Sequence, residues 1–138
     1  MKKLKILHMS VANRGGGITQ YVLQNYHFID RNRFQFDFVT FDSQLDIENE
    51  VVKLGGKVHY VESRAEDDKE SFIKAINNIL DEGYHAIHLH TSYWKSCLVE
   101  ELAMAKNIPV IIVHSHSTMI DILNDDERNK ALQKHNRK

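Results

Sequence analysis

The chain has 138 residues, enough for one domain, and its content of 42% hydrophobic and 27% charged residues is that of a soluble globular protein. Its 18 Lys and Arg nearly balance its 19 Asp and Glu, which argues against nucleic-acid binding through bulk positive charge. The single cysteine, Cys97, excludes an intrachain disulfide framework and a cysteine-rich zinc module.

The first third of the chain alternates between strand and helix patterns. The short apolar run Lys3–Met9, followed by Gly15-Gly16-Gly17, predicts a buried strand that ends in a glycine loop. Apolar residues at helical spacing from Ile18 to Ile29 predict a helix. Alternating phenylalanines then predict a strand over Phe34–Phe41.

The same alternation continues to the end. In chain order we expect a helix over 47–54, a strand over Lys57–Val61, a helix over 67–80, a strand over Ala86–Leu89, a helix over 94–105, a strand over Pro109–Val113 and a last helix from Asn124 toward Lys138. Glycines at 55–56 and at 83 are typical helix stops, because glycine tolerates a positive φ. Asp67-Asp68 suit the positive N-terminus of a helix.

Strands separated by helices of this length indicate βαβ units, and right-handed crossovers then give a parallel sheet with helices on both faces. We expect a Rossmann-like α/β fold in which the first strand lies beside the fourth and the fourth beside the fifth. The chain ends inside its last predicted helix, so we expect residues 1–138 to be one domain that is incomplete at its C-terminal end. An apolar edge left uncovered there would favour self-association.

Glycines mark the loop after the first strand. Backbone N–H groups of a glycine loop at a helix N-terminus favour phosphate. Gly15 and Gly17 match the first two positions of the dinucleotide-binding G-x-G-x-x-G motif, but Gln20 occupies the third. The glycines alone therefore leave open a phosphate-binding loop and a plain turn.

Histidines cluster at two predicted strand ends, His88-Leu89-His90 and His114-Ser115-His116. Side chains at i and i+2 of a strand share a face, so four imidazoles from neighbouring strands are expected to converge. Imidazole suits a base near neutral pH and also zinc, but a structural role is the better interpretation for His88 and for His8. The other histidines, including His27 and His59, are expected at the surface.

The ordered set of these segments resembles a known family. The segments are Lys5-Ile6-Leu7-His8, Gly15-Gly16-Gly17-Ile18, Asp30–Phe38, Leu54–Val58, His88–Thr91, Ile108–Ile111 and His114–Ser117. Their order is similar to that of the amino-terminal domain of family 4 glycosyltransferases, closest to the bacterial capsule and exopolysaccharide branch. The resemblance covers essentially the whole chain.

The resemblance implies a GT-B fold, in which two Rossmann-like domains face a cleft. It also implies a retaining transfer of a sugar from a nucleotide-sugar donor to a glycan or lipid-linked acceptor, with no metal and no cofactor. The donor-binding domain, which carries a paired-glutamate motif, is absent from these 138 residues. We therefore expect this acceptor-side domain to be inactive alone. A stand-alone nucleotide- or phosphate-binding module without catalysis is the alternative.

The resemblance also implies site residues. Gly15, Gly16 and Gly17 match the glycine loop that approaches the donor diphosphate and the acceptor. A family histidine after the fifth strand lies near the transferred sugar, and it corresponds to His116 or His114, with His116 favoured. His90 and Thr91 match the loop after the fourth strand and are expected to face the acceptor.

No segment reaches the ~20 apolar residues that cross a bilayer, and Lys5 and His8 interrupt the only stretch that resembles a signal peptide. We expect a cytoplasmic chain that binds no nucleic acid. The basic residues near Lys138 are expected to form a solvated face, with a peripheral place at the inner membrane surface as the alternative.

Overall fold

The computed structural model describes residues 2–13, 16–91 and 96–116. They form one sheet of five parallel strands, β1 (Leu4–Val11), β2 (Phe34–Thr40), β3 (Val58–Tyr60), β4 (Ala86–Thr91) and β5 (Val110–Ser115), in the order β3-β2-β1-β4-β5. The predicted α/β class is confirmed, and so is the pairing of the first strand with the fourth and of the fourth with the fifth. The expected helix toward Lys138 lies outside the described residues.

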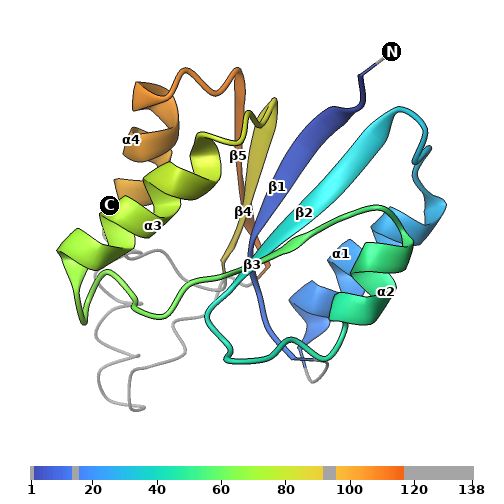
Figure 1. Ribbon diagram of the computed structural model, residues 1–138, viewed down its shortest axis with the longest axis horizontal. Coiled ribbons are helices and arrows are strands. Elements are labelled where there is room, and N and C mark those ends of the chain that lie inside the picture. Colours follow the sequence, from blue (N-terminus) through green and yellow to red (C-terminus); the bar gives the residue numbers. More distant parts are fainter. Residues whose placement is uncertain (1, 14–15, 92–95, 117–138) are drawn as a thin grey trace, which may run out of the picture.

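The helices of the described part are α1 (Gly17–Phe28), α2 (Glu48–Lys53), α3 (Lys69–Leu80) and α4 (Leu98–Ala105). Figure 1 shows α1 and α2 on one side of the sheet and α3 and α4 on the other. Right-handed crossovers require this division, because the chain moves from β1 outward to β3 and then crosses back to β4 and onward to β5.

Each face of the sheet has its own apolar core. Toward α1 and α2, the core includes Phe36, Phe38, Val22, Tyr26 and Val51. Toward α3 and α4, it includes Leu7, Val39, Ile87, Phe72, Ile76 and Ala103. Neighbouring strand residues such as Phe38 and Val39 belong to opposite cores, because successive side chains of a strand point to opposite faces.

Local signals place the helix ends close to where the sequence predicts them. Asp68 caps α3, and its carboxylate accepts a hydrogen bond from the Ser71 amide at 3.1 Å. Gly83, with φ of 89°, follows the end of that helix in the left-handed region that favours glycine. Gly56 has a different reason: a Cβ there would lie 2.2 Å from the carbonyl oxygen of Phe36.

Like β1, which reaches Val11 instead of Met9, the strands β4 and β5 extend further than their sequence pattern predicts. β4 continues to Thr91 and β5 to Ser115, whereas the apolar runs end at Leu89 and Val113. The extra residues include His90 and His114, which are polar but stay in register with each other across the two strands. Backbone pairing therefore carries both strands past their apolar segments. Among the described residues, no helix has the length and apolarity to cross a membrane.

A matched pair of valines tests the two-faced core. Val39 is fully buried in β2, whereas Val52 is 58% exposed on α2. Val39→Ala should lower the free energy of unfolding by about 2 kcal/mol, since it removes two buried methyl groups and leaves a cavity. Val52→Ala should leave stability unchanged within about 0.5 kcal/mol. Urea denaturation of both variants measures the difference, and equal losses would contradict this core.

Candidate functional site

Five histidines lie on one face of the sheet, where β1, β4 and β5 run side by side. His8 is in β1, His88 and His90 are in β4, and His114 and His116 are in and directly after β5. In the strand register His8 is opposite His88, and His90 is opposite His114. The predicted convergence of four imidazoles is confirmed, and His8 adds a fifth. These five residues are called the histidine cluster below.

His90 is the centre of the histidine cluster. Its Nε2 lies 2.9 Å from His8 Nδ1, and its Nδ1 lies 2.8 Å from His116 Nε2. A second contact joins His88 Nε2 to His114 Nδ1 at 3.2 Å. Rings two residues apart are stacked, with centroids 4.1 Å apart for His88 and His90 and 4.0 Å for His114 and His116.

The cluster favours neutral imidazoles. Burial, assisted by neighbouring histidines, holds the pKa of His8 well below its ordinary value and lowers the pKa of His90 to about 3. Burial also lowers the pKa of His88 and of His116. A neutral ring has one N–H and one lone pair, so the protons of the His8–His90–His116 chain must all point the same way.

The row of contacts from His8 through His90 to His116 leaves one buried atom without a partner among the described residues. His8 is 4% exposed, and its Nε2 has no hydrogen bond within the described part of the protein. Its ring instead lies against Phe36, with centroids 4.2 Å apart. Whichever way the protons point, His8 Nε2 carries either an unused proton or an unused lone pair.

A groove of about 380 Å³ separates the histidine face from α1. Its walls include His8 and His88 from the sheet and Tyr21, Asn25 and Phe28 from the helix. Tyr21 also presents its ring edge-on to His114 and His116, with centroids 5.4 Å away in each case. Aromatic and polar groups thus line an open space beside the cluster, an arrangement suited to a ligand that offers both hydroxyl groups and apolar surface.

The glycine loop ends at the start of α1. Gly16 is the residue before the helix, and α1 begins at Gly17. A Cβ at either position would meet no atom within 4 Å, so internal packing does not explain these glycines. Gly15, which the resemblance also implicates, lies outside the described residues.

Side chains that the sequence analysis did not single out hold this loop. The Thr19 hydroxyl, in the first turn of α1, donates to the Ala12 carbonyl at 2.7 Å and accepts from the Ala12 amide at 3.0 Å. The Asp42 carboxylate accepts from the Asn13 amide at 2.9 Å. The only sequence signal for Thr19 was a hydroxyl two residues after the glycines, which is common in surface helices as well.

Thr91 is placed differently from His90. It is the last residue of β4, paired with Ser115, and the alternation of a strand directs it to the face opposite the histidine cluster. Its carbonyl accepts a hydrogen bond from the His116 amide at 2.8 Å. Thr91 therefore contacts the site through its backbone, which continues the pairing of β4 and β5 up to His116.

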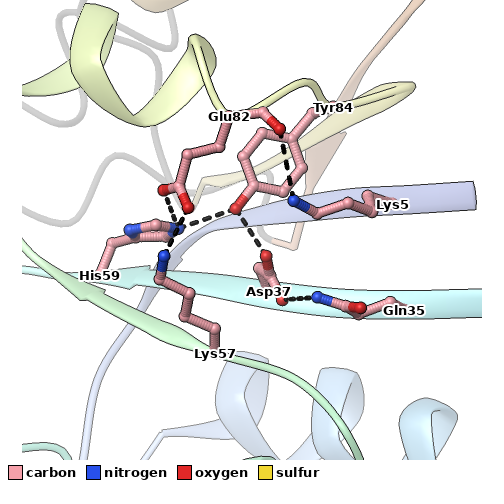
Figure 2. A network of polar contacts seen from close by, with 7 residues as sticks. All are labelled: Lys5, Gln35, Asp37, Lys57, His59, Glu82 and Tyr84. Atoms are coloured by element: carbon pink, nitrogen blue, oxygen red, sulfur yellow. Dashed lines mark hydrogen bonds and ion pairs between the residues drawn. The ribbon is translucent and has the colours of Figure 1, made fainter.

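A second polar group lies at the opposite, amino-terminal edge of the sheet (Figure 2). The Tyr84 hydroxyl donates to the buried Asp37 carboxylate at 2.6 Å, and Gln35 donates to the other carboxylate oxygen at 2.9 Å. Burial, and then the hydrogen bond to Asp37, raises the pKa of Tyr84. Since Tyr84 gives its proton to Asp37, His59 Nε2, 2.7 Å from the hydroxyl oxygen, must be the donor there.

The network continues from His59 to Glu82 and Lys57. His59 Nε2 lies 3.3 Å from the Glu82 carboxylate, which also pairs with Lys57. The expectation that His59 is a surface residue is wrong: it is 9% exposed, because the β3 strand turns its side chain toward Tyr84. His27, in contrast, is exposed as predicted and pairs with Glu50 at 2.6 Å. The groups in Figure 2 satisfy one another, so we assign this network to stability.

Two triads of the histidine cluster have the arrangement needed to hold a metal ion. In His8, His88 and His90, and again in His90, His114 and His116, one nitrogen from each ring lies within 4.8 Å of the others. His90 belongs to both triads.

Comparison with known proteins gives one informative match. The chain is 31% identical over 118 residues to a Bacillus subtilis (strain 168) protein named "Putative glycosyltransferase EpsF". The match covers 83% of this chain and 30% of that protein, so the chain corresponds to less than a third of its relative. No family model and no solved structure matches the chain significantly. The relationship supports the resemblance to glycosyltransferases.

Removing one hydroxyl tests the structural network. Tyr84→Phe should lower the free energy of unfolding by about 1–3 kcal/mol, because the buried Asp37 carboxylate loses a hydrogen-bond donor. Adding Asp37→Asn to Tyr84→Phe should restore part of the lost stability, since the buried side chain at position 37 is then uncharged. Denaturant unfolding of the two single variants and the double variant gives the coupling energy. Strict additivity would show that Tyr84 and Asp37 do not depend on each other.

Proposed function

We propose that this chain forms the acceptor-side domain of a glycosyltransferase that moves a sugar from a nucleotide-sugar donor to a glycan or lipid-linked acceptor. The observation that carries the proposal is the 31% identity over 118 residues to a protein named as a glycosyltransferase. The fold supports it, because ligands of open parallel sheets bind beyond the carboxyl ends of the strands, where the glycine loop and His116 lie. The similarity favours a transferase over a stand-alone phosphate-binding module.

In this proposal the start of α1 and the groove beside Tyr21 bind different parts of the ligands. The helix start at Gly16 and Gly17 accepts the close approach of a phosphate or a sugar hydroxyl, because no side chain stands in the way. The groove beside Tyr21 and Phe28 offers aromatic surface to a sugar ring. In this proposal a second, donor-binding domain completes the GT-B arrangement, and the transfer is a retaining one.

His116 is the proposed catalytic residue. It directly follows β5, and its Nε2 contacts His90, so in this proposal its Nδ1 is the atom that meets the ligand. A neutral imidazole there can hydrogen-bond the transferred sugar or stabilise charge on the departing diphosphate. His114 is stacked on His116 and bonded to His88, so it is the second candidate.

A histidine series tests this assignment in the protein that joins this chain to its donor-binding domain. His116→Ala should lower turnover of a nucleotide sugar by about 10²–10⁴ with little change in the thermal midpoint, because the residue lies at the ligand edge. His27→Ala, on the exposed face of α1, should change neither. If only His114→Ala lowers turnover, the catalytic role belongs to His114. If His114→Ala and His116→Ala both keep full turnover, neither histidine has that role.

A further experiment tests whether donor binding requires a second domain. Residues 1–138 alone should show no sugar transfer from any nucleotide sugar, because the proposal places donor binding in a second domain. Radiolabelled nucleotide sugars with purified protein give the measurement, and the two-domain protein is the positive control. Turnover above background by the 138 residues would contradict this placement of the donor site.

A further inference from the structure

We propose that His90, His114 and His116 form a binding site for a divalent transition-metal ion, Zn²⁺ foremost, and that His8 and His88 position these ligands. The site shares His114 and His116 with the proposed function, but its test measures metal binding alone, so either proposal can fail without the other. The family resemblance implied a site without metal; five imidazoles from three strands are a separate observation that points the other way.

The ligand atoms already converge. One nitrogen from each of the three rings lies within 4.8 Å of the other two, and His90 Nδ1 and His116 Nε2 face each other at 2.8 Å. Zinc binds imidazole nitrogen at about 2.0–2.1 Å, so His90 Nδ1 and His116 Nε2 must move slightly apart to share one ion. His114 and His116 are half-buried, so the described residues do not fully enclose these two rings.

Three imidazole nitrogens are a ligand set that suits divalent transition metals. Imidazole is a good ligand for Zn²⁺, Cu²⁺ and Ni²⁺ and a poor one for Mg²⁺ and Ca²⁺, which prefer oxygen. Each ring binds the ion through a nitrogen that carries no proton. Three protein ligands leave the fourth position of a tetrahedral ion open to water or to an oxygen of a bound molecule.

The remaining two histidines supply the outer hydrogen bonds that a metal site needs. When His90 uses Nδ1 as the ligand, its Nε2–H donates to His8 Nδ1 at 2.9 Å. His114 Nδ1 is likewise held by His88 Nε2 at 3.2 Å, which leaves the other nitrogen of His114 as the ligand. Such contacts fix the tautomer and orientation of a ligand ring, and losing one typically costs about 10–100-fold in metal affinity.

The inner triad of His8, His88 and His90 is the competing set. Burial argues against it, because His8 is enclosed against Phe36. His90 belongs to both triads, and it cannot bind an ion in each of them and also keep its contact to His8. The orphaned His8 Nε2 is explained by the positioning role, in which the ring is retained for its Nδ1.

Cobalt titration of the chain tests the proposal. Co²⁺ in a tetrahedral site absorbs strongly in the visible region, and Zn²⁺ should displace it with a stoichiometry of one ion per chain. His114→Ala and His116→Ala should each abolish the spectrum. His8→Ala should keep the band shape and weaken binding by about 10–100-fold, a result that separates positioning from ligation. His27→Ala is the matched control and should bind as the parent does.

Other results would overturn the site or its ligands. Absence of cobalt absorption together with no detectable heat of Zn²⁺ binding would exclude it. Binding that survives both His114→Ala and His116→Ala, or that His27→Ala removes, would show adventitious surface binding. If His8→Ala abolishes metal binding and His116→Ala retains it, the ion belongs to the inner triad of His8, His88 and His90. Circular dichroism verifies folding of every variant, and His116→Gln replaces His116→Ala if the alanine variant fails to fold.

Discussion

The parallel pairing of β4 with β1 is the contact on which the rest of the structure depends. It joins segments about 80 residues apart and sets Ile6 opposite Ala86 and His8 opposite His88. Because the chain reaches β4 only after crossing the sheet from β3, the helices before and after this crossover lie on different faces. The same pairing brings the histidines of β1, β4 and β5 to one face, next to the point where the strand order reverses.

The two edges of the sheet use buried polar groups in opposite ways. At the amino-terminal edge, Asp37, Tyr84 and His59 form a closed network whose donors and acceptors match (Figure 2). On the opposite face, the histidine cluster adjoins an open groove, and the buried His8 Nε2 has no hydrogen-bond partner among the described residues. A satisfied buried network stabilises the fold, whereas a half-buried ring beside a groove, such as that of His88, can contact a ligand.

Histidine suits such a cluster because it can be buried without charge. Five carboxylates or ammonium groups at these distances would repel one another and resist removal from water. Imidazoles instead stack, as His88 and His90 do in β4, and contact one another through ring nitrogens, as His88 and His114 do. The strand extension to His90 and His114 therefore follows from the side chains as well as from backbone pairing.

The sequence by itself determined the element order, the parallel sheet, the start of α3 at Asp68, the glycine that follows that helix at Gly83 and the convergence of the paired histidines, because periodicity and capping are local properties. Only the tertiary structure decided that His8 joins the cluster, that His59 is buried and that Asp37 meets Tyr84. These contacts join residues 25–82 positions apart. Their formation depends on strand order and register, which no local pattern encodes, and the same dependence explains why Thr91 and His90, neighbours in sequence, lie on opposite faces of β4.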